Sequence, residues 1–95
     1  MVSFIVHLKF APEERAEVAE ALRLLAEASR QEPGCVSYIP HYADGDLDTV
    51  LIYEQYQDAE AQQAHRETAH FKKYAVGGIY QLMRDRRVEN LVALV

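Results

Sequence analysis

Two histidines in one segment are the residues of this sequence best suited to chemistry. His65 and His70 lie in the stretch from Tyr53 to Tyr74, which also contains Glu54. An imidazole titrates near neutral pH, so either histidine can act as a general acid or base, and a half-buried glutamate can orient a histidine or accept a proton. We therefore take His65, His70 and Glu54 as candidate catalytic residues. The alternative is a structural role, in which His65 completes an apolar helix stripe and His70 bonds a local carbonyl.

Aromatic and imidazole side chains on the neighbouring segments are candidates for holding a substrate. Tyrosine rings can stack on a planar molecule and hydrogen-bond to its oxygens. The expected substrate-binding set is His7, Tyr38, His41, Tyr53, Phe71 and Tyr74. Such tyrosines also serve as core residues with a solvated hydroxyl, and the two strand histidines could instead face a subunit interface.

The sequence contains no strong metal-binding motif. Four histidines accompany Glu54 and Cys35, but no pair shows the i, i+4 spacing or the Cys-x-x-Cys pattern of a dedicated site. We expect no metal and no cofactor. Cys35 follows a Pro-Gly turn without an evident basic neighbour, so we interpret it as a small buried hydrophobe.

Composition narrows the class of protein. Ninety-five residues with 49% hydrophobic content fit one domain over residues 1–95. Ten basic against fifteen acidic residues give a net charge of −5, which disfavours nucleic-acid binding because phosphate contact needs a concentrated positive surface. The absence of a long apolar run predicts no membrane span, and a single cysteine fits a reducing compartment, so we expect a cytoplasmic protein.

The first half of the chain predicts a strand, a helix and an edge strand. In residues 2–10 every even-numbered residue is apolar, whereas most of the residues between them are polar, which is typical of a strand with one buried face. A helix is expected from Pro12 to Gln31, ending at Pro33-Gly34. The segment Cys35–Tyr42 favours an edge strand because Pro40 cannot donate a ladder hydrogen bond.

The second half predicts a strand, a bent helix and a final strand. Residues 49–56 form the strand, and Asp58 caps a helix that bends near Thr68. In a straight helix His65 and His70 would point about 140° apart. Gly77-Gly78 is expected to end the helical region, and residues 87–95 to form the last strand.

The order strand, helix, strand, strand, helix, strand predicts an α+β, ferredoxin-like split βαβ fold with an antiparallel sheet. Right-handed crossovers place both helices on the same face of that sheet. Three strands, residues 4–6, 50–53 and 91–95, carry apolar residues at both odd and even positions, so both faces of the sheet are expected to be buried. Since the helices cover only one face, we expect a second copy to cover the other in a homodimer. The alternative is that short apolar runs are tolerated at a surface.

Three landmarks carry a resemblance to a known family. They are Glu32-Pro33-Gly34-Cys35, Tyr53-Glu54-Gln55-Tyr56, and the run Ala64 to Phe71 with a His followed five residues later by His-Phe. In their order and spacing the chain resembles the antibiotic biosynthesis monooxygenase (ABM) domain family over its whole length. The resemblance implies a dimeric α+β barrel with one pocket per subunit between helices and sheet.

The family includes cofactor-free oxygenases of quinols and polyketide phenols, isomerases of small phosphorylated signalling molecules, and haem-degrading enzymes. The haem degraders use a histidine at what looks like Ala75, together with a tryptophan and an asparagine. This chain has no tryptophan and offers His7 where the asparagine is expected, which argues against haem.

The resulting functional hypothesis is a cofactor-independent monooxygenase that oxidises a small phenolic or quinol-type substrate with dioxygen. One alternative is a proton-shuttle isomerase of a small oxygenated or phosphorylated metabolite, using the same histidines. Another is a non-catalytic, dimeric ligand-binding module, because a shared fold does not fix a function.

Overall fold

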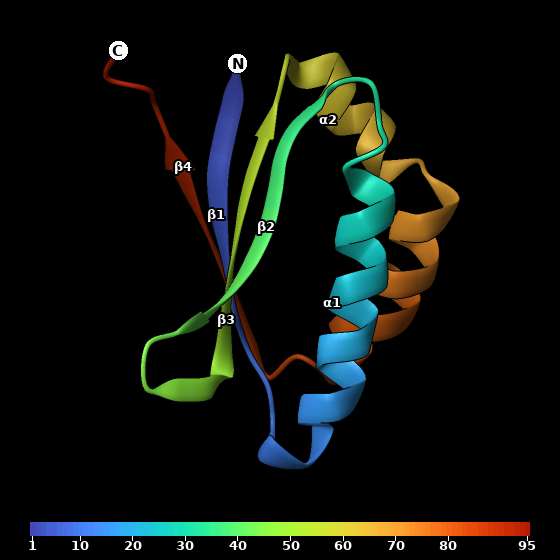
Figure 1. The fold of residues 1–95 in the computed structure, drawn as a ribbon, viewed down its shortest axis with the longest axis vertical. Coiled ribbons are helices and arrows are strands. Elements are labelled where there is room, and N and C mark those ends of the chain that lie inside the picture. Colours follow the sequence, from blue (N-terminus) through green and yellow to red (C-terminus); the bar gives the residue numbers. More distant parts are fainter.

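A four-stranded antiparallel sheet with all helices on one face forms the protein (Figure 1). The computed structural model describes residues 1–95. The strands are β1 (Val2–Lys9), β2 (Cys35–Ala43), β3 (Asp46–Tyr56) and β4 (Asp85–Leu91), in the spatial order β2-β3-β1-β4. This order is the predicted ferredoxin-like α+β fold.

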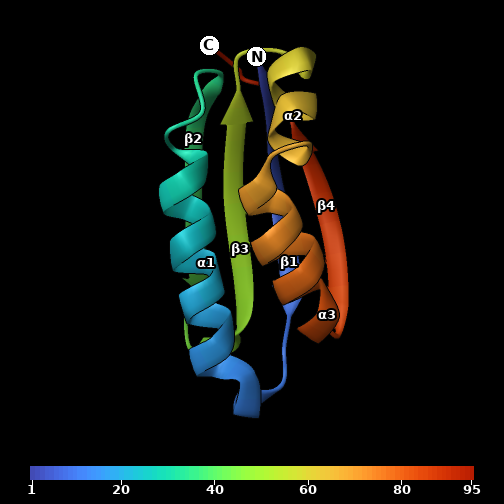
Figure 2. The ribbon, with the colours of Figure 1, turned by 90° about the vertical axis from the view of Figure 1, so that its right-hand side faces the viewer.

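The helices form a single layer against the sheet. They are η1 (Pro12–Glu14), α1 (Arg15–Ser29), α2 (Ala59–Arg66), the π-type helix η2 (Phe71–Ile79) and α3 (Tyr80–Leu82). Figure 2 shows α1 in front of β2, η2 with α3 in front of β1, and β3 between the two helical regions. The expected helix from Pro12 to Gln31 therefore has a 3₁₀ first turn and ends two residues early. None of these helices combines the length and the apolarity needed to cross a membrane.

Alternation along the strands builds the core between the two layers. In β1, Phe4, Val6 and Leu8 are buried, while the residues between them lie on the opposite face. Leu25 of α1 and Ile79 of η2 pack into the same cluster from the helical side. Each such side chain stabilises the fold by roughly 1.5–3 kcal/mol when it is removed from water.

The edge position of β2 agrees with the expectation from Pro40, since β2 pairs only with β3. The β3 strand starts at Asp46, three residues before the predicted start. The Asp46 carboxylate accepts hydrogen bonds from the backbone N–H of Asp48 and the hydroxyl of Thr49, which orders these residues. Gly45 adopts a φ of 78°, a left-handed conformation that glycine reaches without strain.

A break in the second helical region lies where the bend was predicted. Helix α2 ends at Arg66, and the Thr68 hydroxyl donates to the carbonyl of His65 and accepts from the N–H of Phe71. Thr68 thereby ends one helix and begins the next. The prediction that Gly77-Gly78 ends the helical region is wrong, because helix continues through them to Leu82.

The last strand also differs from the prediction of residues 87–95. Strand β4 begins at Asp85, opposite Lys9, and ends at Leu91, opposite Ser3. Few residues of the neighbouring strand β1 remain beyond that pair, so residues 92–95 have no ladder partner. Val92, Leu94 and Val95 are nearly or fully exposed.

Candidate functional site

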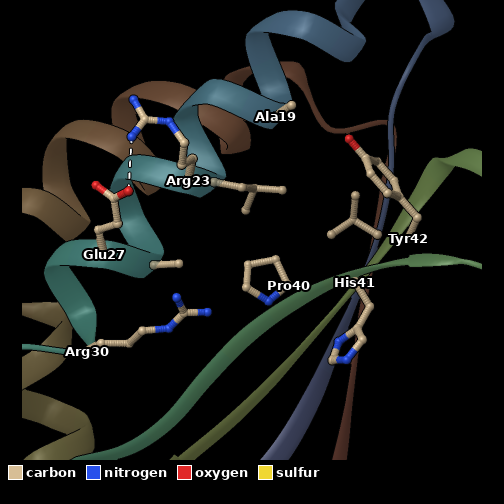
Figure 3. Close-up of a pocket in the computed structure, with 10 residues that line it drawn as sticks. Ala19, Arg23, Glu27, Arg30, Pro40, His41 and Tyr42 are labelled. Carbon is tan, nitrogen blue, oxygen red and sulfur yellow. Dashed lines mark hydrogen bonds and ion pairs between the residues drawn. The ribbon is translucent and has the colours of Figure 1, made fainter.

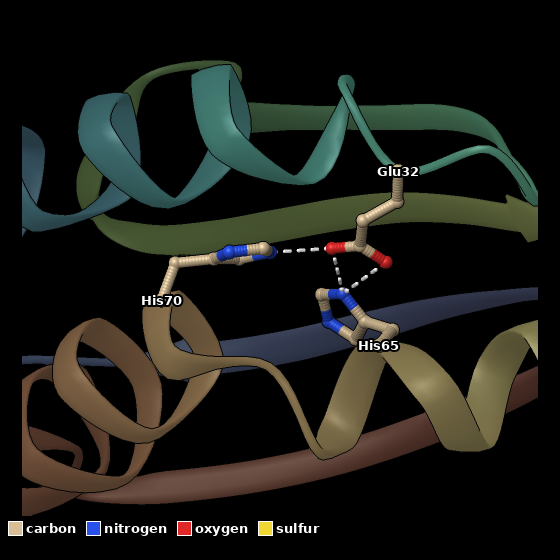
Figure 4. Close-up of side chains that lie close together, drawn as sticks. All are labelled: Glu32, His65 and His70. Atoms are coloured by element: carbon tan, nitrogen blue, oxygen red, sulfur yellow. Dashed lines mark hydrogen bonds and ion pairs between the residues drawn. The ribbon is translucent and has the colours of Figure 1, made fainter.

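The most concentrated group of ionisable side chains is formed by Glu32, His65 and His70 (Figure 4). The Glu32 carboxylate lies 2.9 Å from Nδ1 of His65 and 2.5 Å from Nε2 of His70. The His65 side chain is 4% exposed, that of Glu32 12% and that of His70 21%. The site therefore joins a buried imidazole and a partly exposed one through a single carboxylate.

Three segments bring these side chains together. Glu32 lies on the turn after α1, His65 in the last turn of α2, and His70 just before η2. A continuous helix would direct the two histidines to different faces. The break at Thr68 redirects the chain so that both rings reach the same carboxylate.

Close packing fixes the turn that carries Glu32. A Cβ on Gly34 would overlap the Cβ of Ala61 in the first turns of α2. The side chain of Asp58 accepts a hydrogen bond from the N–H of Ala61 and caps that helix. Glycine at position 34 thus allows the Glu32 turn to approach the helix that carries His65.

A second carboxylate lies on the other side of the His65 ring. Glu54 is 6% exposed, and its Oε1 lies 3.9 Å from Nε2 of His65. The hydroxyl of Tyr56 donates a 2.7 Å hydrogen bond to the same oxygen. Burial raises the pKa of Glu54 to about 7, and the Tyr56 hydrogen bond opposes that shift.

The ring of His65 is held in one orientation by its surroundings. Burial lowers the pKa of His65, while Glu32 acts in the opposite direction, so the imidazole is neutral at pH 7. Because Nδ1 faces the Glu32 carboxylate, we assign the N–H to Nδ1 and the lone pair to Nε2. Nε2 therefore points toward Glu54 as an available base.

Two of the predicted substrate-binding residues contact this site. The centroids of the Phe71 and Tyr38 rings lie 5.1 Å and 5.6 Å from that of His65. Burial raises the pKa of Tyr38, so its hydroxyl stays protonated. Tyr74 is half-buried and packs against the core, and its ring does not stack on either histidine.

The other three predicted residues lie on the opposite face of the sheet. His7, His41 and Tyr53 share the strand parity that points away from the helices. His7 bonds Glu89 of β4 at 3.1 Å. Ile5, His41, Leu51 and Tyr53 help to line a shallow hollow of about 440 Å³ on this face. The structure thus does not bring these three residues to His65.

A small cavity adjoins His65 and Glu54. Its volume is about 40 Å³, enough for a water or dioxygen molecule but not for an aromatic ring. The side chains of Gln62, Arg66 and Arg86 complete its polar lining. Arg66 and Arg86 also act to lower the pKa of Glu54, but burial outweighs them and the carboxyl keeps its raised pKa.

A larger cavity of about 290 Å³ lies elsewhere, between α1 and the edge strand β2 (Figure 3). Arg23 at its border is paired with Glu27, and Nε of Arg30 donates to the carbonyl of Tyr38. Of the predicted site residues only His41 borders it, and Figure 3 shows its ring turned away from α1. Size alone therefore does not identify the reactive site, whereas the buried ionisable groups do.

Neither Glu32 nor Arg86 was predicted from the sequence as a site residue. Glu32 entered the sequence analysis only as part of the Glu32-Pro33-Gly34-Cys35 landmark. No spacing rule links Glu32 to residues on another helix, although a carboxylate beside a Pro-Gly turn is a usable signal. Cys35 needs no functional role, because burial and nearby Glu32 raise the pKa of its thiol to about 11.

Comparison with known proteins gives one consistent result. The family model described as antibiotic biosynthesis monooxygenase matches residues 1–76. The curated Bacillus subtilis protein "Putative monooxygenase YcnE" is 31% identical over 78 residues, which cover 82% of each chain.

Solved structures of similar proteins have the same fold. A crystal structure of an antibiotic biosynthesis monooxygenase aligns with a TM-score of 0.92 at 28% identity and covers 100% of both chains. The structure of PA3566 from Pseudomonas aeruginosa aligns with a TM-score of 0.90 at 28% identity, covering 99% of this chain and 94% of the other.

Proposed function

The chain belongs to the antibiotic biosynthesis monooxygenase family, and we propose that it is a cofactor-independent monooxygenase that oxidises a small phenol or quinol with dioxygen. The observation that supports this function most directly is the orientation of the buried His65. Its Nδ1 is bonded to Glu32, and its Nε2 faces Glu54 beside a cavity. A neutral, oriented imidazole at such a place is suited to remove a phenolic proton.

The proposed reaction begins with transfer of the phenolic proton to Nε2 of His65. Glu32 stabilises the resulting imidazolium through Nδ1–H, as a carboxylate does in a catalytic triad. The phenolate passes one electron to dioxygen, and the phenoxyl radical and superoxide combine at a ring carbon. Loss of the hydrogen on that carbon as a proton, with cleavage of the O–O bond, gives a quinone and one water.

Glu54 is the proposed acceptor of that second proton. With a pKa of about 7 it exchanges protons near neutral pH, and Tyr56 holds the carboxylate in place. Arg66 and Arg86 favour the phenolate at the cavity. The existing cavity fits dioxygen but is too small for an aromatic ring. The substrate ring therefore enters when the long side chains of Gln62 and Arg66, on α2, move aside.

The test is an oxygen-electrode assay of the purified protein against a panel of hydroquinones, naphthols and anthrones. We expect oxygen consumption equal to quinone formed, and one atom of ¹⁸O₂ in the product. His65→Asn should lower kcat by roughly a hundredfold or more. Turnover that continues without oxygen would refute the proposal.

The two arginines at the cavity also support a second candidate. A proton-shuttle isomerase of a small phosphorylated metabolite would use Arg66 and Arg86 for the phosphate and His65 with Glu54 for the proton transfers. The same assay separates the two functions, because isomerisation consumes no oxygen.

We also propose that the protein is a homodimer joined through the sheet face opposite the helices. Ile5, Leu51 and Tyr53 on this face are only half-buried, and Ile39 is 42% exposed. The exposed apolar residues 92–95 add to this uncovered surface. A second copy packed on this face would remove the apolar sheet side chains and residues 92–95 from water.

A further inference from the structure

We propose that Glu32, His65 and His70 form a binding site for a divalent transition-metal ion, and that a bound ion prevents His65 from acting as a base. The binding itself is independent of the proposed oxygenase function. Only the inhibitory consequence rests on that function.

The spacing of the three donor atoms is close to that of a metal site. The carboxylate oxygen, Nδ1 of His65 and Nε2 of His70 all lie within 4.8 Å of one another. Ligand atoms about 2.1 Å from a tetrahedral ion lie about 3.4 Å apart. The Glu32 oxygen now sits 2.9 Å and 2.5 Å from the two nitrogens, so it must withdraw by less than about 1 Å, which a glutamate side chain can do by rotation.

The donor set indicates which ions fit. Two imidazole nitrogens and one carboxylate oxygen suit Zn²⁺, Fe²⁺ or Co²⁺, whereas Mg²⁺ and Ca²⁺ prefer oxygen ligands. Three protein ligands leave at least one position for water, as in metal sites that are not purely structural.

The protein holds these donors in place by features independent of any ion. Gly34 packs against Ala61, which fixes the turn after α1 that carries Glu32, and Thr68 fixes the break between His65 and His70. Glu54 supplies a further carboxylate behind the His65 ring, 3.9 Å from Nε2. Metal-bound histidines characteristically direct their other nitrogen to such a carboxylate.

Metal binding and base catalysis require opposite tautomers of His65. As a base, His65 carries its proton on Nδ1 and the lone pair on Nε2. As a ligand, it must offer the Nδ1 lone pair to the ion, which moves the proton to Nε2 and directs it toward Glu54. A bound ion therefore removes the lone pair that would accept the phenolic proton.

The test uses the full-length protein freed of metal with a chelator and then dialysed. Co²⁺ is titrated with detection of its visible absorption, and Zn²⁺ by calorimetry. We expect one ion per chain, with affinity lowered at least roughly tenfold in Glu32→Gln and in His70→Asn. Glu60→Gln, which changes an exposed carboxylate of α2, is the matched control and should bind as the unaltered chain does.

A second measurement does not depend on the variants folding. In ¹⁵N NMR spectra of the unaltered protein, Zn²⁺ should shift the ring nitrogens of His65 and His70 and leave those of His7 and His41 unchanged. Absence of stoichiometric binding, or shifts confined to His7 and His41, overturns the proposal.

Activity separates this inference from the proposed function. If Co²⁺ binds as expected and no substrate consumes oxygen, the metal site stands and the oxygenase falls. If the chelated protein turns over and saturating Zn²⁺ leaves the rate unchanged, the inhibitory part of the inference is wrong.

Discussion

Glu32 and His65 are 33 positions apart in the sequence, yet the carboxylate of one accepts a 2.9 Å hydrogen bond from Nδ1 of the other. This contact decides which ring nitrogen of His65 carries the proton. It therefore also decides which nitrogen faces Glu54 and the small cavity.

Glu32→Gln should disturb that choice while preserving the shape of the side chain. A neutral amide stabilises the imidazolium less than a carboxylate does, so we expect kcat to fall by roughly tenfold to a hundredfold with a smaller effect on KM. The ¹⁵N spectrum of His65 should show a mixture of tautomers. Glu60→Gln is the control, and an unchanged tautomer together with unchanged kcat would contradict the role of Glu32.

Glu54 should make stability depend on pH. The folded state keeps its proton up to about pH 7, whereas an unfolded glutamate releases it near its ordinary value of 4.5. The folded state thus binds more protons in this range, and the free energy of unfolding falls as pH rises through it.

Glu54→Gln should remove this dependence and retain an oxygen that accepts from Tyr56. The difference in unfolding free energy between the variant and the unaltered protein should rise by about 3 kcal/mol from pH 4.5 to 8, as measured by urea denaturation. A difference that stays flat with pH would mean that Glu54 is ionised throughout.

Tyr56→Phe should raise the pKa of Glu54 further. The Tyr56 hydroxyl stabilises the ionised carboxylate at 2.7 Å, and its loss leaves burial unopposed. A ¹³C titration of the Glu54 carboxyl, or the pH profile of kcat, should move to higher pH by about one unit. Tyr42→Phe, which alters an exposed tyrosine, should not move it.

Gly34→Ala should destabilise the protein through its overlap with Ala61, by roughly 1–3 kcal/mol. Ala61→Gly should cost about 1 kcal/mol by itself, because glycine weakens a helix. The double variant should be more stable than the sum of the two losses predicts, since the new methyl group then has room. Simple additivity in thermal unfolding would show that the two positions do not touch.

Leu51→Lys should convert the proposed dimer into a 10.9 kDa monomer, because it places a charge on the uncovered sheet face. Sedimentation velocity at micromolar concentration measures the change. Glu60→Lys on the helical side should leave the dimer intact. If the unaltered protein already sediments as a monomer, the dimer proposal fails.

Local patterns in the sequence were sufficient for most of the fold. The alternation from Val2 to Phe10 predicts the central strand, Pro40 predicts the edge strand, and Thr68 lies where the helix bends. The end of the last strand could not be predicted from its own residues. It depends on where β1 begins, because a ladder stops when its partner does.

The site was predictable only in part. His65, His70 and Glu54 stand out by residue type, but Glu32 joins them through tertiary packing that no local spacing encodes. Strand parity could have separated His7 and Tyr53 from the site, because His7 follows the buried Val6 in β1 and Tyr53 lies between the buried Ile52 and Glu54 in β3. Arg86 reaches the cavity from β4, whose start was predicted at residue 87 and lies at Asp85.

The interruption between α2 and η2 makes chain length at this point as important as residue identity. Each residue of an α-helix turns the following ones by about 100°. Removing one residue between Arg66 and Ala69 would swing the second imidazole away from its carboxylate partner, even with every functional side chain retained. In an alignment, a gap at this joint would therefore signal lost chemistry more reliably than many substitutions.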